Sequence, residues 1–80
     1  MIDKPHEGAI ELRLVFNFIK AKSCKKTMHT QRPDLDNLAK GLCDSLNGVA
    51  FLDDAQIVKL TCEKNFSDVE NIEITIIEIK

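Results

Sequence analysis

Hydrophobic and polar residues alternate along the first part of the chain. Apolar side chains occupy every second position of residues 9–20, at Ile10, Leu12, Leu14, Phe16 and Phe18. Alternation of this length predicts a strand with one strongly buried face. Because Val15 and Ile19 fall on the opposite face, we expect that side to be partly covered too.

The pattern changes in the middle of the chain. Residues 21–33 have no periodicity and predict an exposed basic loop that ends at Pro33. From Asp34 to Asn47 leucines recur at steps of three and four, at Leu35, Leu38, Leu42 and Leu46. This spacing predicts one apolar face of a helix. Asp34 or Asp36 is a suitable N-cap, and Asn47-Gly48 is a suitable end.

Two more strands are predicted after the helix. Residues 49–52 form a short apolar connection to Asp53-Asp54, residues 56–64 resemble a strand, and residues 65–71 a polar turn. Residues 72–76 alternate again and predict a last strand. Ile77 and Ile79 change face, which suggests a bulge or burial on both sides. The order β-α-β-β predicts an α+β fold in a single domain, 1–80, with one helix on a mixed or antiparallel sheet.

Composition narrows the class of protein. The chain has 80 residues, is 44% hydrophobic and 30% charged, and contains no apolar run near ~18 residues, so we expect no membrane span. The first residues lack the pattern of a signal peptide. Three cysteines without a C-x-x-C pair are typical of reduced thiols in a cytoplasmic protein. A core this small makes oligomerisation an expectation.

Charge is segregated along the chain. The formal net charge is −2, which taken alone argues against a nucleic-acid partner. Between residues 20 and 32, however, the charged residues are all basic: Lys20, Lys22, Lys25, Lys26 and Arg32. From Asp34 to Asp54 there follow five carboxylates and one lysine. Such segregation indicates a binding role for the loop and a separate role for the aspartates.

The aspartates are candidates for a metal site. If the chain is extended at Asp34-Leu35-Asp36, both carboxylates point to one side, where they repel unless a cation lies between them. Mg²⁺ prefers such oxygen ligands. Asp53-Asp54 can approach this point if the connection runs back along the helix.

Lys40 and the start of the helix complete the candidate chemistry. Lys40 lies four residues after Asp36 and could face a phosphate, as could the helix N-terminal N–H groups. A carboxylate-bound metal, this lysine and the basic loop together indicate phosphodiester hydrolysis with metal-activated water.

Each feature also has an ordinary interpretation. An aspartate can cap a helix, Asp53-Asp54 can be a turn, and Lys40 can pair with Asp44 four residues on. The basic loop can be a solvated turn, and His29 within it is predicted to be solvated rather than bound to phosphate. We expect the four phenylalanines to lie in the core. An EF-hand is excluded because Ser45 stands where that loop needs glutamate.

The segment Asp34-Leu-Asp-Asn-Leu-Ala-Lys40, with Asp44-Ser-Leu-Asn and Phe51-Leu-Asp-Asp-Ala-Gln-Ile-Val, resembles the RusA family of Holliday-junction resolvases. The match spans residues 32–58. It implies a homodimeric, Mg²⁺-dependent endodeoxyribonuclease, with Mn²⁺ as a substitute, that cuts four-way DNA junctions in recombination and repair. It also implies a bacterial or phage-encoded (often prophage) protein of the cytoplasm, with branched DNA as partner and no small-molecule cofactor.

The resemblance assigns roles to residues. The metal-binding and catalytic aspartates would be Asp34, Asp36 and Asp54, with Asp53 as a further metal candidate, and Lys40 would be the catalytic lysine. The basic loop would contact DNA phosphates through the cations Lys20, Lys22, Lys25, Lys26 and Arg32.

One departure from the family is expected to matter. Family members usually have a strand and a helix before the strand placed at residues 9–20, so we expect a member shortened at the N-terminus. The alternative to an active enzyme is a catalytically silent DNA-binding or assembly module derived from the family. A plain structural domain would bind neither metal nor DNA.

Overall fold

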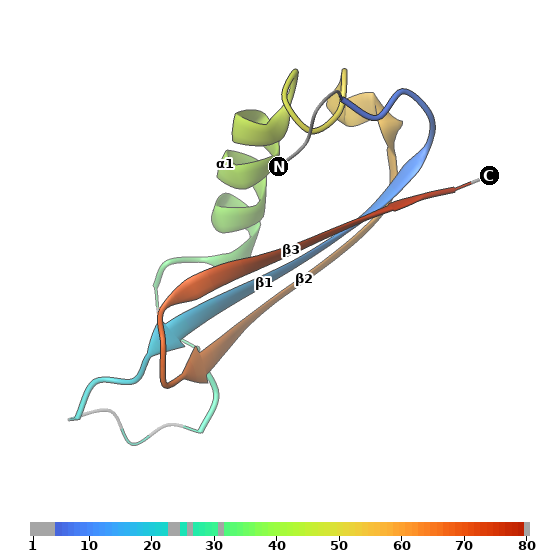
Figure 1. The fold of residues 1–80 in the computed structure, drawn as a ribbon. Coiled ribbons are helices and arrows are strands. Elements are labelled where there is room, and N and C mark those ends of the chain that lie inside the picture. Colours follow the sequence, from blue (N-terminus) through green and yellow to red (C-terminus); the bar gives the residue numbers. More distant parts are fainter. Residues whose placement is uncertain (1–4, 23–24, 26, 31, 80) are drawn as a thin grey trace.

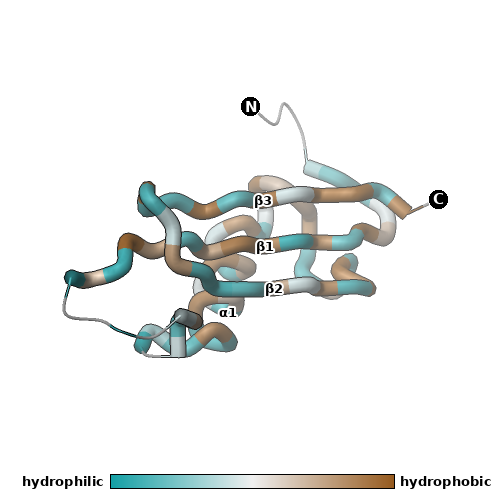
Figure 2. The backbone as a smooth tube through the Cα atoms, turned by 90° about the horizontal axis from the view of Figure 1, so that it is seen from below, coloured by the Kyte–Doolittle hydropathy of each residue, from teal (hydrophilic) through white to brown (hydrophobic). Residues whose placement is uncertain are grey.

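The computed structural model describes residues 5–22, 25, 27–30 and 32–79. Its elements, in chain order, are β1 (Ile10–Ile19), α1 (Leu35–Leu46), the 3-10 turn η1 (Asp54–Gln56), β2 (Ile57–Ser67) and β3 (Asn71–Glu78). The sheet has three strands, and Figure 2 shows β1 between β2 and β3. β1 pairs in parallel with β2 and antiparallel with β3. The predicted order β-α-β-β and the single helix beside a mixed sheet are confirmed.

The core lies between α1 and one face of the sheet (Figure 1). Leu12, Leu14 and Phe16 of β1 are buried together with Ala39 of α1. The leucines of the predicted helical stripe pack around them: Leu35, Leu38, Leu42 and Leu46. The alternation in β1 and the three-to-four spacing in α1 therefore bury the same apolar layer from two sides.

The two ends of α1 follow the predicted signals. Asp34 is the N-cap residue, with extended backbone, and the helix begins at Leu35. At the other end the Asn47 backbone N–H donates to the Cys43 carbonyl over 3.0 Å. Gly48 has a φ of +81°, a left-handed conformation that glycine adopts without strain. The helix therefore ends where the Asn-Gly pair predicted.

The opposite sheet face is polar. The Asn17 side-chain amide donates to Asn71 and to Glu73, each over 2.7 Å. Val15 is half-buried, but Ile19 is 61% exposed, so the cover expected on this face reaches only Val15. One face of the sheet therefore supplies the core and the other is closed mainly by hydrogen bonds.

One expectation about the last strands was wrong, and of the second only one alternative is met. The polar turn predicted at residues 65–71 is restricted to residues 68–70, because β2 continues to Ser67 by pairing with the end of β1. No bulge occurs in the pairing of β3 with β1, and the register shift lies instead between Ile10 and Glu11 in the pairing with β2. The alternative, burial on both sides, is met at Ile76 and Ile77, which are half-buried on opposite faces of the sheet, whereas Ile79 is exposed.

The single helix covers the centre of the sheet better than its flanks. On the helix side, Leu60 of β2 is 47% exposed, and Ile72 and Ile74 of β3 are 50% and 42% exposed. Exposed apolar rows on edge strands favour association with another chain. Among the described helices none is long and apolar enough to cross a membrane.

Candidate functional site

Asp34 and Asp36 stand at the start of α1 with little to hold their carboxylates. Asp34 occupies the N-cap position, yet its side chain makes no capping hydrogen bond. Among the described residues its side chain has a polar contact with the exposed Arg32, whose Nη1 lies 3.4 Å from Oδ2. Asp36 Oδ1 accepts from the Asn37 backbone N–H over 3.0 Å. The capping interpretation is therefore wrong for the Asp34 side chain, whose oxygens remain available to a cation.

Lys40 follows one turn after Asp36 on the same side of the helix. Its side chain is exposed, and among the described residues it makes no ion pair, so the surface pair expected with Asp44 does not form. Both Asp36 and Lys40 border an apolar groove of about 560 Å³ between α1 and β2. Charged groups therefore rim a groove with an apolar floor.

The floor of this groove contains two thiols, Cys43 of α1 and Cys62 of β2. Partial burial raises the pKa of both thiols, so neither is activated for chemistry. This agrees with the structural role predicted for the cysteines, while Cys24 lies outside the described residues.

Asp53 and Asp54 have different surroundings although they are adjacent. Asp53 caps η1: its Oδ1 accepts from the Ala55 backbone N–H over 3.0 Å, and its own N–H donates to the Gln56 side chain over 2.8 Å. The Ala55 N–H lowers the pKa of Asp53. A hydrogen bond shared with Asp53 raises the pKa of Asp54, as do desolvation and the charges of Asp53 and Asp44. The cap therefore favours the ionised form of Asp53, and a cation beside Asp54 would relieve its repulsion from Asp53 and Asp44.

One chain does not bring these aspartates together. Asp54 interacts electrostatically with Cys43 and Asp44, both in the C-terminal part of α1. Asp54 therefore lies near that end of the helix. Asp36 and Asp44 are about 12 Å apart along the helix axis at 1.5 Å per residue. Figure 1 shows η1 and the start of α1 at opposite ends of the helix. The connection does not run back along the helix, which was the condition for Asp53-Asp54 to approach Asp34, because residues 47–51 stay hydrogen-bonded at the C-terminal end of α1.

A three-carboxylate metal site is therefore not formed by the described residues of one chain. What one chain offers is two pairs of oxygen ligands, Asp34 with Asp36 and Asp53 with Asp54, which face different ends of α1. Oxygen donors of this kind suit Mg²⁺ or Mn²⁺, and two or three carboxylates from different segments are needed to hold it firmly.

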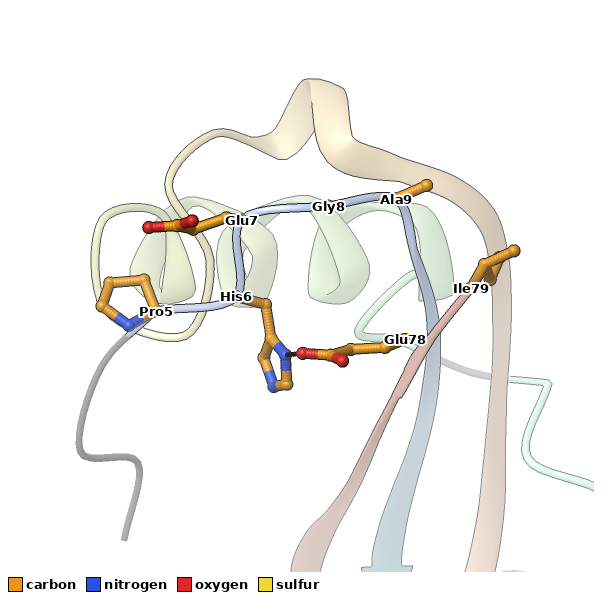
Figure 3. Close-up of a pocket in the computed structure, with 7 residues that line it drawn as sticks. All are labelled: Pro5, His6, Glu7, Gly8, Ala9, Glu78 and Ile79. Atoms are coloured by element: carbon orange, nitrogen blue, oxygen red, sulfur yellow. Dashed lines mark hydrogen bonds and ion pairs between the residues drawn. The ribbon is translucent and has the colours of Figure 1, made fainter.

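The segment before β1 closes the end of the molecule where Asp53 and Asp54 lie. Gln56 Nε2 donates to the carbonyls of His6 and Gly8 over 2.8 and 2.9 Å. His6 Nδ1 lies 2.6 Å from Glu78 Oε1, beside a cavity of about 510 Å³ (Figure 3). These roles of Gln56 and His6 were not predicted, although Asp53 and Gln56 have the spacing of a capping box.

The basic loop between β1 and α1 presents its cations to solvent. Lys20, Lys22, Lys25 and Arg32 are exposed, while Lys26 lies outside the described residues. The Lys20 ammonium lies 5.5 Å from the centre of the Phe66 ring, a cation–π geometry. Lys64 of β2 donates to the Pro33 carbonyl over 2.9 Å, which ties the end of the loop to the sheet. The loop cations therefore lie at the same end of the molecule as Asp34.

His29 is not the solvated loop residue that the sequence suggested. It is 8% exposed, and its ring lies between Phe18 and Phe66, with centroid distances of 4.6 and 4.9 Å. Phe16 and Phe51 are in the core as expected, whereas Phe18 and Phe66 are only half-buried and hold this histidine. Phe51 is fully buried, so it is not available to a ligand beside Asp53.

Comparison with known proteins agrees with the motif. The family model for endodeoxyribonuclease RusA matches residues 1–77. A crossover junction endodeoxyribonuclease, rusA, of Lactococcus phage r1t is 38% identical over 86 aligned positions, which cover 99% of this chain and 66% of the relative. An uncharacterized Bacillus subtilis (strain 168) protein, YqaN, is 40% identical over 50 residues, 62% of this chain and 35% of the relative.

The chain thus spans about two thirds of the phage relative and about a third of the Bacillus relative. No solved structure matches it. The family model covers nearly the whole chain, and the alignment with the phage relative covers 99% of it. The chain therefore belongs to the RusA family of endodeoxyribonucleases.

Proposed function

We propose that this chain is a structure-selective DNA endonuclease that resolves four-way junctions by metal-dependent phosphodiester hydrolysis. The observation that carries the proposal is the state of the first helical turns. The Asp34 side chain makes no capping hydrogen bond, and Lys40 makes no ion pair with the described residues, so both are available at the same end as the basic loop.

The proposed metal is Mg²⁺, with Mn²⁺ as a substitute, held by Asp34, Asp36 and Asp54. When bound it would supply a water of lowered pKa and neutralise charge on the phosphate. Lys40 would donate to a phosphate oxygen. Asp53 is better suited to support than to ligation, because its carboxylate already caps η1.

We further propose that the metal site is completed by a second copy of the chain. Since Asp54 lies at the opposite end of α1 from Asp34 and Asp36, one chain supplies only part of the ligand set. Two copies related by a twofold axis with their helices antiparallel would bring each start of α1 beside the partner's η1. The apolar groove next to Asp36 and Lys40 supports this arrangement, because it offers surface for a partner to cover.

The substrate would be branched DNA, in keeping with the name of the phage relative. Lys20, Lys22, Lys25, Lys26 and Arg32 would contact phosphates, so binding should weaken steeply as salt is raised. A homodimer would present two such loops and two cutting sites, which suits paired cuts on a junction of near-twofold symmetry. Such a protein would act in DNA recombination and repair in a bacterial or phage-infected cell.

The test uses a labelled synthetic four-way junction beside a linear duplex of matched sequence, each with Mg²⁺ or with EDTA. Symmetric cuts in the junction that require Mg²⁺ and vanish in Asp36→Asn are expected. The matched control is Asp68→Asn, an exposed aspartate in the turn between β2 and β3. Cutting of duplex and junction alike would contradict structure selectivity.

A second function is favoured by one observation, the separation of the aspartates within a single chain. The alternative is a catalytically silent DNA-binding or assembly module. Binding to the junction without cleavage in either metal would support this module and exclude the endonuclease.

A further inference from the structure

His29 is the most completely buried polar side chain in the described part of the basic loop. Its imidazole is 8% exposed, and its Nδ1 is enclosed without a hydrogen-bond partner among the residues that the structure describes. The ring contacts Phe18 and Phe66, with angles of 49° and 31° between the planes. Burial of a polar atom without a partner costs free energy, so the packing of the ring has to compensate for it.

The two phenylalanines give this contact a structural meaning. Phe18 and Phe66 are directly paired across β1 and β2, near the ends of both strands. A histidine that lies against both rings therefore fastens the middle of the loop to two strands at once. Lys64, also from β2, holds Pro33 at the end of the loop. The loop thus has two described attachments to the sheet, the second of them adjacent to Asp34.

We propose that His29 is a positioning residue, whose ring anchors the basic loop on β1 and β2 and so fixes where its cations meet DNA. This rests on the proposed function, because it assumes that the loop binds phosphates. An anchored loop has less conformational entropy to lose when DNA binds. Lys20 shares the anchor, since its ammonium lies over the Phe66 ring that His29 contacts.

A different role for His29 would be direct contact with a phosphate. The cavity beside it, about 390 Å³, is lined by polar groups that include Asn17, Thr27 and Asn65. The two roles differ in what they require of the imidazole. Anchoring needs a flat ring of this size, whereas a phosphate contact needs a ring nitrogen, so phenylalanine can replace histidine in the first role only.

The first measurement needs no DNA. Wild type, His29→Ala and His29→Phe are treated with trypsin, and cleavage after Lys22 and Lys25 is timed by mass spectrometry. Loss of both ring contacts should speed these cuts by about tenfold in His29→Ala, whereas His29→Phe should match the wild type. His6→Ala, at the other end of β1, is the control and should not change cleavage in the loop. Equal cleavage in His29→Ala and wild type would overturn the anchor.

The second measurement is the salt dependence of junction binding. In His29→Ala fewer loop cations should contact phosphates. The plot of the logarithm of the binding constant against the logarithm of the salt concentration should therefore become less steep, by about one to two units of slope. His29→Phe should restore the wild-type slope. If His29→Phe restores resistance to trypsin but not DNA binding, the imidazole contacts DNA directly and positioning is contradicted.

The two arms separate failure of this inference from failure of the proposed function. Absence of DNA binding by the wild type would remove the endonuclease proposal, while the trypsin result would still decide whether His29 anchors the loop. If His29→Ala does not fold, Phe66→Leu takes its place, because it keeps an apolar side chain but removes one ring contact. It should also speed cleavage, and unchanged cleavage would overturn the anchor.

Discussion

Asp34 and Asp54 lie beyond opposite ends of the parallel β1–β2 pair: Asp34 follows β1 and the loop, and Asp54 begins η1, which leads into β2. When a helix joins two parallel strands, it returns the chain to the end of the sheet where the first strand began. A residue before the helix and a residue before the second strand therefore lie at opposite ends of the sheet. The topology therefore decides that one copy cannot unite the three proposed metal ligands, Asp34, Asp36 and Asp54, whatever their spacing in the sequence.

The proposed shared site predicts complementation between two inactive variants. Asp36→Asn and Asp54→Asn should each lose cleavage, but mixing them should restore it, because a mixed dimer has one site with neither substitution. That site should nick a single strand rather than make paired cuts. The measurement is a junction assay on denaturing gels with equal amounts of both variants. Mixtures that stay inactive while size-exclusion chromatography shows mixed dimers would contradict sharing between copies.

Lys40→Met should reduce the cleavage rate by about 10²–10³-fold while leaving junction binding nearly unchanged. The exposed ammonium makes no ion pair with the described residues, so its removal should alter stability by less than about 0.5 kcal/mol. Single-turnover cleavage and thermal unfolding are the two measurements. Lys59→Met is the control, since that lysine is also exposed and lies 3.8 Å from Glu11 on the other sheet face. An equal loss in the control would exclude a specific role for Lys40.

The two adjacent aspartates should respond oppositely to substitution. Asp54→Asn should raise the melting temperature at pH 7 without metal, because it removes repulsion from Asp53 and Asp44. Folding raises the pKa of Asp54, and protonation of the wild-type carboxylate relieves the same repulsion. The difference in melting temperature between the variant and the wild type should therefore shrink as pH falls through that pKa.

Asp53→Ala should lower the melting temperature at pH 7, because the cap of η1 is lost. Folding lowers the pKa of Asp53. The stability that its ionised side chain contributes is therefore fully present above the ordinary pKa of an aspartate, and it is lost as pH falls through the lowered value. Thermal unfolding between pH 3 and pH 7, a range set about the ordinary aspartate value, measures both variants. If both substitutions changed the melting temperature in the same direction, the surroundings assigned to Asp53 and Asp54 would be refuted.

Phe51→Ala should cost about 3–5 kcal/mol of unfolding free energy, which is enough to threaten folding of a domain this small. The side chain is fully buried with Ile10 and Ala50, and it supports the turn that leads to Asp53. Urea unfolding followed by circular dichroism is the measurement. Leu52→Ala is the control, because Leu52 is 56% exposed and should change stability by less than about 0.5 kcal/mol. A similar loss in both would show that burial does not distinguish them.

The sequence by itself determined the features that depend on neighbours in the chain. The alternation in β1 and the leucine spacing in α1 defined both elements to within a residue or two, because each pattern records which face is buried. The Asn47-Gly48 pair marked the end of α1 for a local reason, the left-handed backbone at Gly48. The family motif, too, is a property of the linear sequence.

Tertiary structure decided everything that depends on which segments meet. Two of the three residues added to the predicted β2, Asn65 and Ser67, are polar, and pairing with the end of β1 extends the strand through them. The residues next to His29 in the sequence are typical of an exposed loop. Its burial depends instead on Phe18 and Phe66, which lie side by side on paired strands. Most of all, the distance between Asp34 and Asp54 follows from the parallel pairing of β1 and β2, because local spacing does not specify the direction in which a strand joins a sheet.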